Sequence, residues 1–218
     1  MVRAASESHA DTRLFYIVHK AFRLGTNRLV DGTEKLPPSV LQPLIGSVWS
    51  FYAGVLDHHH HTEDTSILPA LVALRPDLEA LVNDLANDHR RLIVAIDAVN
   101  AAVTAFEQQP DVARQRTLHE AIVSVREEFF PHLDVEDAKI IPAITESMPP
   151  EEWERLDARA LKTMPRRYLP RAVGALDEVI QSLPEQERPS SPPPLPIRLM
   201  LALSWRKKWA AWVKPLLV

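Results

Sequence analysis

The chain has 218 residues, of which 46% are hydrophobic, a formal net charge of -4 and no cysteine. This length and composition allow one domain with a buried core plus an appendage. The lack of cysteine excludes disulfides, thiolate metal sites and cysteine nucleophiles. Histidine and carboxylate side chains are therefore the strong metal ligands that remain.

Several other classes of function are excluded by what the sequence lacks. It has no Gly-x-Ser-x-Gly motif, no P-loop and no His-Glu-x-x-His motif, so we expect no hydrolytic site. The acidic balance of the main body gives no indication of nucleic-acid binding. The first residues lack the apolar region of a secretory signal. We also expect no membrane span, which would need an uncharged apolar run of about 18 residues. We therefore expect a soluble, cytoplasmic protein.

Helical periodicity runs through residues 10–147, whereas strand signals are nearly absent. We predict an all-α fold class, namely an up-down-up-down four-helix bundle with a C-terminal helical extension. The helices are expected from residues 8–11 to Leu29, from residues 39–43 to Leu74, from Leu78 to Phe106, and from Val112 to Ser147.

Local signals mark the ends and one irregularity of these helices. Asp31-Gly32 is expected to close the first helix, and Asp111 to cap the fourth. Pro131 lies inside the fourth helix, directly before His132, and predicts a kink or π-bulge at that position.

Residues 148–218 form the extension, which holds no histidine and four of the five tryptophans. We expect helices over residues 151–163 and 167–183, a proline-rich loop over residues 185–196, and an amphipathic Trp/Lys/Arg stretch over residues 197–213. That stretch either lies in a membrane interface or folds back over the bundle. We favour the second, because tryptophans in a soluble chain usually find a core.

One histidine, glutamate and proline pattern occurs twice in the predicted bundle. The first copy is His59-x3-Glu63-Asp64-x4-Pro69, and the second is His132-x3-Glu136-Asp137-x4-Pro142. A lone histidine precedes each copy by about forty residues, His19 before the first and His89 before the second. Residues i and i+4 share one face of a helix. The pattern therefore predicts four imidazoles and two carboxylates that converge inside the bundle.

Such a cluster indicates a metal centre, although a lone buried histidine or a single His-x3-Glu pair would usually be structural. Burying these groups without a cation is costly, because ionised groups removed from water need a compensating charge. Imidazole with carboxylate suits iron, with manganese as the alternative, and six ligands exceed what one tetrahedral zinc uses. We predict two ions, with Glu63 and Glu136 as bridges and with terminal nitrogens from His19, His59, His89 and His132.

The run of four histidines at residues 58–61 cannot all face the core, since successive helical residues point about 100° apart. The alignment of the two copies selects His59, and His60 is the leading candidate for an additional ligand. His58 and His61 are expected to support the site or lie at the surface, and His9 and His119 are expected to face solvent. Asp64 and Asp137 are expected mostly to orient the imidazoles or to form local hydrogen bonds, with direct ligation of metal as the alternative.

These motifs resemble those of the hemerythrin-like family, the HHE cation-binding domain. The resemblance covers about residues 10–147 and rests on His19, His59-His60-x-x-Glu63-Asp64 with Leu68-Pro69, Asp88-His89-Arg90, and His132-x3-Glu136-Asp137 with Ile141-Pro142. It implies a four-helix bundle that holds a non-haem di-iron site with an oxo or hydroxo bridge. The ligand that the family implies is dioxygen or a related small oxidant. Ferritin-like bundles use Glu-x-x-His instead, which is absent here.

One departure from the oxygen carriers of that family bears on function. The carriers have His-x3-His on the third helix, whereas His89 here has Leu85 and Ile93 at those spacings. An extra water or another ligand, with His60 foremost, would fill the place. We expect binding of dioxygen, nitric oxide or peroxide, with a peroxide-decomposing activity as one outcome. The alternative is a non-enzymatic iron or oxygen sensor, or an iron store, whose C-terminal segment docks on a partner or a membrane surface.

Overall fold

The computed structural model describes residues 9–189 and 195–217, and within these residues the chain is helical and contains no strand. The bundle part comprises α1 (Arg13–Lys35), α2 (Pro38–Thr62), α3 (Leu68–Leu74), α4 (Glu79–Gln108), α5 (Val112–Val135) and α6 (Ile141–Ser147). The prediction of an all-α chain is confirmed. Two of the four predicted long helices are not single regular helices, because a π-helical segment divides each of them.

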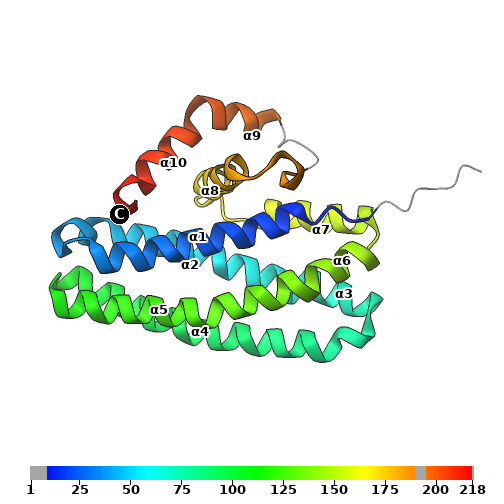
Figure 1. Ribbon diagram of the computed structural model, residues 1–218, viewed down its shortest axis with the longest axis horizontal. Coiled ribbons are helices and arrows are strands. Elements are labelled where there is room, and N and C mark those ends of the chain that lie inside the picture. Colours follow the sequence, from blue (N-terminus) through cyan, green and yellow to red (C-terminus); the bar gives the residue numbers. More distant parts are fainter. Residues whose placement is uncertain (1–8, 190–194, 218) are drawn as a thin grey trace, which may run out of the picture.

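The long helices α1, α2, α4 and α5 lie side by side, and α3 and α6 continue α2 and α5 at one end (Figure 1). The extension comprises α7 (Pro150–Thr163), α8 (Leu169–Ser182), α9 (Leu195–Met200) and α10 (Arg206–Val213). A short 3-10 turn, Glu185–Glu187, follows α8, and a π-helical segment, Leu201–Trp205, joins α9 to α10. The centre of the predicted proline-rich loop, residues 190–194, lies outside the described residues.

Two apolar clusters build the bundle and leave room for the histidines between them. The larger cluster packs the inward faces of all four long helices and includes Leu56, Leu92 and Phe129, which are fully buried. The smaller cluster, which includes Ile67, Leu85 and Ile140, lies on the other side of the histidines, at the end of the bundle that holds α3 and α6. Each helix therefore carries its histidine between two blocks of core residues.

The first helix is longer than predicted. Asp31-Gly32 does not close it, because α1 continues through Gly32 to Lys35 and ends at the extended residue Leu36. Gly32 serves packing instead. A Cβ atom there would lie 3.1 Å from Leu216 Cδ2, so the missing side chain admits the C-terminal segment against α1.

The π-helical segments are Glu63–Ile67 and Glu136–Ile140, one in each copy of the repeated pattern. The predicted irregularity is present, but Pro131 lies within α5 and outside the segment, so the cause was assigned to the wrong proline. Pro69 and Pro142 are the shared feature. A proline lacks the N–H for the preceding turn and its ring crowds the carbonyl four residues back, which favours a wider turn. Accordingly, the Leu68 N–H binds the Glu63 carbonyl oxygen five residues earlier.

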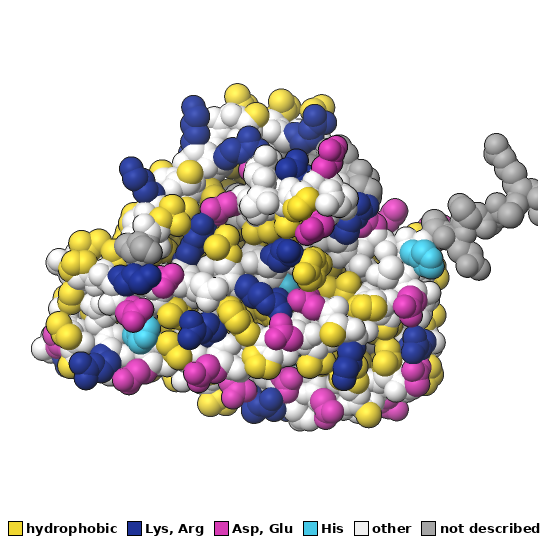
Figure 2. Space-filling model, in the orientation of Figure 1, with side chains coloured by type: hydrophobic (Ala, Val, Ile, Leu, Met, Phe, Trp, Pro, Cys, Tyr) yellow, Lys and Arg dark blue, Asp and Glu magenta, His cyan; other side chains and the backbone are white. Residues whose placement is uncertain are grey.

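The C-terminal segment packs back onto the bundle, which is the arrangement favoured from the sequence. The rings of Trp209 and Trp212 contact Phe51 of α2, and Val213 and Leu216 are buried. The opposite face of the segment stays exposed, with Leu203 at 74%. Basic and apolar side chains both gather on this outermost part of the molecule (Figure 2).

One helical segment among the described residues, Pro38–Leu74, is long and apolar enough to cross a membrane by length and composition. This corrects the expectation that no stretch would meet such a test. The segment carries core residues of the bundle, including Leu41 and Leu56, which have no exposed surface. A core helix of a bundle can have the length and composition of a membrane-spanning helix. The apolar residues of this segment therefore fit its place in the core.

Candidate metal centre

Four separate parts of the chain bring six ionisable side chains to one point inside the bundle. The set contains His19 of α1, His59 of α2 with Glu63, His89 of α4, and His132 of α5 with Glu136. All six are buried, and His19, Glu63 and Glu136 have no exposed surface at all. The convergence predicted from the repeated pattern is therefore present.

The potential ligand atoms fall into two groups of four. The first group is His60, Glu63, His89 and His132, and the second is His19, His59, Glu63 and Glu136. Within each group, one donor atom per residue lies within 4.8 Å of all the others. Glu63 belongs to both groups, which is the arrangement that a carboxylate between two ions requires, whereas Glu136, predicted as a second bridge, belongs to the second group only.

The seven side chains predicted as metal ligands thus all lie in the cluster, His60 included. The imidazole of His60 is buried and stacks on that of His89, with ring centroids 4.2 Å apart. The two outer histidines of the run point elsewhere, since His61 is exposed and His58 Nε2 donates to the carbonyl oxygen of Ala160, 2.9 Å away.

The two remaining histidines differ from each other. His9 is exposed, as expected. His119 is not simply a solvent-facing residue, because it is half-buried and its Nδ1 lies 3.1 Å from Thr33 Oγ1. Neither histidine lies in the cluster.

Two aspartates hold imidazoles on neighbouring helices. Asp137 Oδ1 lies 2.6 Å from His19 Nδ1, and Asp64 Oδ1 lies 2.8 Å from His89 Nδ1. Each aspartate belongs to one copy of the repeated pattern and binds the lone histidine of another helix. Because a hydrogen bond from Nδ1–H fixes the tautomer, the lone pair of Nε2 then faces the centre of the cluster.

The aspartates were expected to orient imidazoles, but their cross-helix partners were not predicted. Sequence reasoning also missed Asp88, whose Oδ2 lies 3.7 Å from His132 Nδ1. The one available signal was an acidic residue directly before the lone histidine, His89. Only the packing of α4 against α5 shows that Asp88 faces the histidine of the other helix.

Most inward atoms of the cluster lack hydrogen-bond partners in the protein, although Nε2 of His89 and of His132 lie 3.2 Å apart. Among the described residues, nine buried side-chain nitrogen or oxygen atoms have no hydrogen bond. All except Gln115 Oε1 belong to the cluster, and they include both carboxylate oxygens of Glu63 and of Glu136. Buried polar groups are nearly always hydrogen-bonded in folded proteins. This concentration of unpaired oxygen and nitrogen atoms therefore fits bound cations.

Burial and mutual repulsion shift the pKa values of these groups in opposite directions. Burial raises the pKa of Glu63 well above its ordinary value, and the charges of Glu136 and Asp64 add to the shift. Burial also lowers the pKa values of His59 and His60 well below 6.5, and the surrounding imidazoles lower them further. Without a cation, the protein therefore disfavours both the carboxylate and the imidazolium forms at these positions.

Glu136 and His132 behave differently because they face each other, with Glu136 Oε2 at 3.3 Å from His132 Nε2. Burial alone would raise the pKa of Glu136, but His132, His19 and His89 outweigh it and the pKa is lowered. Burial alone would lower the pKa of His132, but Glu136 and Asp88 raise it. Without a cation, the protein therefore favours the ionised forms of this pair.

Comparison with known protein families supports the same reading. The family model of the hemerythrin HHE cation binding domain matches residues 11–144. The chain belongs to this hemerythrin family. The matched range contains both copies of the pattern and all seven candidate ligands, and it ends before α7. No curated protein and no solved structure gives a significant match.

Membership of the hemerythrin family and the buried His/Glu cluster together indicate a metal-binding protein. The extension, which begins at α7, lies outside the matched range. Its contacts with the site are therefore features of this chain that the family match does not describe.

The hydrogen bond from His19 to Asp137 should contribute to metal affinity. Asp137→Asn removes the charge that holds the His19 imidazole, so metal affinity should fall about 10- to 100-fold. Asp134→Asn is the matched control, since Asp134 and Asp137 both pair with Arg23, but Asp134 is 71% exposed and forms no hydrogen bond with a described imidazole. Competition with a chromogenic chelator measures both affinities. Equal affinities for the two variants would show that Asp137 does not support the site.

The metal-free protein should lose stability as the pH falls below about 6.5. The unfolded chain protonates His60 near its ordinary pKa of 6.5, whereas the folded chain keeps it neutral because its pKa is lowered by burial. Each such histidine then reduces the free energy of unfolding by about 1.4 kcal/mol per pH unit. His60→Gln should remove its share of the slope, and the exposed His61→Gln should not. Urea unfolding of chelator-treated protein at about pH 7 and 5.5 tests this, and equal slopes would contradict it.

Proposed function

We propose that this protein is a non-haem di-iron hemerythrin-like protein that binds dioxygen, nitric oxide or peroxide. The observation that carries the proposal is the pair of four-residue groups that share Glu63. A shared carboxylate with imidazoles on either side suits two iron ions, with manganese as the alternative metal. The proposal includes the up-down-up-down order of the four long helices that was predicted from the sequence.

The seven candidate ligands divide unequally between the two proposed ion positions. The group that contains His60 offers three imidazoles and Glu63, whereas the group that contains His19 offers two imidazoles and the two glutamates. We assign the external ligand to the second position, because it receives fewer nitrogen donors from the protein. His60 then takes the place left by the missing second histidine of the third helix.

Aromatic side chains form an apolar wall beside the second position. The rings of Phe15 and Phe22 lie 5.7 Å and 5.0 Å from the ring of His59, and both phenylalanines are buried. Trp153 of the extension packs against Phe15 at 5.7 Å. An apolar wall on this side favours small uncharged ligands over water and over larger polar substrates.

When bound, a pair of iron ions supplies a redox-active Lewis acid that can bind a diatomic ligand or peroxide. The residues of this chain hold and insulate that pair. Asp64 and Asp137 keep Nδ1 of His89 and His19 protonated and thereby keep both Nε2 lone pairs directed inward. Burial keeps His59 and His60 neutral, which is the form that binds metals.

A second candidate function is a sensor of iron or oxygen, and one contact favours it. His58 is adjacent to the candidate ligand His59 and donates to the carbonyl oxygen of Ala160 in α7. A movement of the α2 backbone at the metal centre would therefore reach the extension directly. In this alternative, the metal changes how the C-terminal segment docks on a partner. A membrane surface as that partner stays the less favoured prediction.

The reactions of the iron-loaded protein test the proposal. The reduced protein should give charge-transfer bands between roughly 320 and 380 nm on exposure to dioxygen or peroxide, and a distinct spectrum with nitric oxide. Oxygen evolution from peroxide would identify an enzyme, and reversible binding alone would identify a carrier or sensor. His60→Ala should weaken or shift these bands, and His61→Ala, at the exposed neighbour, should not. A protein that holds iron but gives no spectral response to any of the three ligands would contradict the proposal.

A further inference from the structure

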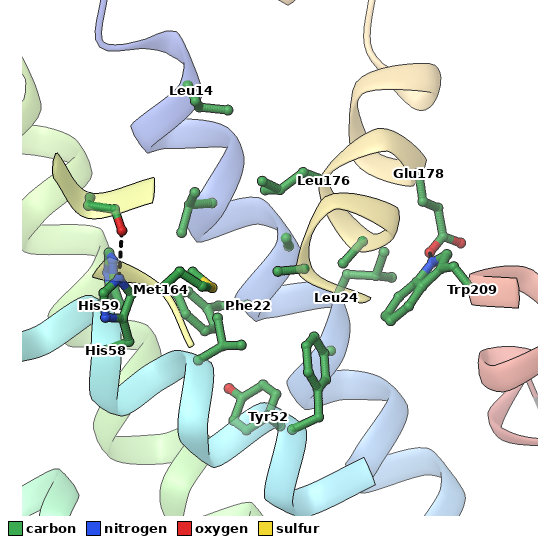
Figure 3. A pocket seen from close by; sticks show the side chains of 18 of the residues that line it. Leu14, Phe22, Leu24, Tyr52, His58, His59, Met164, Leu176, Glu178 and Trp209 are labelled. Carbon is green, nitrogen blue, oxygen red and sulfur yellow. Dashed lines mark hydrogen bonds between the residues drawn. The ribbon is translucent and has the colours of Figure 1, made fainter. Parts of the chain in front are cut away.

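A second feature of the molecule is an apolar cavity between the bundle and the extension. Its volume is about 220 Å³, and it lies between α1 and α2 on one side and α7, α8 and α10 on the other. In Figure 3, His58 and His59 lie at one end, and Glu178 and Trp209 lie at the other. Its walls are mostly apolar and include Phe22, Leu24, Phe51, Val55, Leu176 and Trp212.

The extension is fixed around this cavity by close contacts and by charged pairs. A Cβ atom on Gly174 of α8 would lie 2.6 Å from Trp209 Cβ, so the two helices touch where the glycine lies. Arg206 of α10 donates two hydrogen bonds of 2.7 Å to Asp177 of α8. The cavity is consequently bounded by packed helices and is partly open to solvent, and a detached tail does not account for it.

Several polar groups around the cavity are already bonded to the protein. Arg28 donates to both carboxylate oxygens of Glu178, at 2.8 Å and 2.7 Å, and Trp209 Nε1 donates to the same carboxylate at 2.8 Å. His58 is bonded to Ala160, as described above. Water in this space would find few partners, and an apolar occupant would restore the dispersion contacts that the walls lack.

Charge around the cavity selects against an anionic ligand. Arg28 is neutralised by Glu178, and the further ionisable wall residues are the imidazoles of His58 and His59 and the acidic Asp157. Burial raises the pKa of Asp157, and the nearby charge of Asp11 adds to the shift. A carboxylate head group would meet acidic side chains and no free cation on this wall.

The volume limits the size of the occupant. An apolar protein cavity of about 150 Å³ stays dry and binds benzene, which has about six non-hydrogen atoms. In proportion, 220 Å³ accommodates about nine such atoms. The separation of the two ends in Figure 3 favours an elongated shape over a compact ring.

We propose that this cavity is a binding site for a neutral, elongated apolar molecule, such as a medium-length alkyl or isoprenoid alcohol. The occupant spans from the tryptophans of α10 to the imidazole of His59. It touches the face of the proposed metal centre that the extension covers. The shape and charge of the cavity do not depend on bound metal. We therefore expect the site in metal-loaded and in metal-free protein.

Three eight-carbon compounds that differ only in their head groups test the proposal, namely 1-octanol, octanoate and octylammonium. Calorimetry and the fluorescence of Trp209 and Trp212 report binding to the full-length chain. We expect saturable binding of one 1-octanol per chain at about pH 8, with octanoate at least about tenfold weaker. Both measurements are repeated after chelation, so that failure of the metal proposal leaves this one testable.

Variants that fill the cavity provide the structural control. Ala175→Phe on α8 and Val55→Phe on α2 place a ring in the cavity from opposite walls, and each should weaken 1-octanol at least about tenfold. Ala98→Phe adds the same ring to an exposed position of α4 and should leave binding unchanged. Circular dichroism and metal content show which variants are folded. No saturable binding of 1-octanol, equal binding of octanoate, or unchanged binding in both folded cavity variants would overturn the proposal.

Discussion

The structure depends on one electrostatic constraint, the burial of four imidazoles and two carboxylates around a common point, with most of their inward atoms unpaired. Burial of such groups is unfavourable unless cations or hydrogen bonds compensate it. The surrounding features answer this constraint. Apolar clusters on both sides exclude water, and the π-helical segments begin at Glu63 and Glu136. The aspartates fix the outer nitrogens of His19 and His89, so that the inner nitrogens are left for metal.

The repeated pattern was sufficient to predict which side chains would meet, because i and i+4 spacing fixes a shared helical face regardless of the fold around it. It was not sufficient to predict how helices pair across the bundle. Asp64 and Asp88 show the difference, since each serves a histidine on another helix. Gly32 shows a second limit. The sequence suggests a helix end there, but the glycine makes room for Leu216, a residue from the opposite end of the chain.

The positions of the π-helical segments were also only partly predictable from the sequence. A proline in a helix predicts a disturbance, but Pro131 and Pro142 are equally visible in the sequence and only the second follows a π-helical segment directly. The recurrence of the proline at the same distance after each glutamate was the stronger signal. The run of four histidines likewise separates by direction: one imidazole binds the extension, two enter the cluster and one faces solvent. Successive residues of one helix turn therefore connect the extension, through His58, with the metal centre, through His59 and His60.

The central claim is that the cluster holds two ions with Glu63 between them. Anomalous diffraction at the iron edge from crystals of iron-loaded protein tests it most directly. The account predicts two iron peaks inside the bundle, one beside His60 and His89 and the other beside His19 and His59, both in contact with Glu63. A single peak, or peaks outside the two groups, would contradict it.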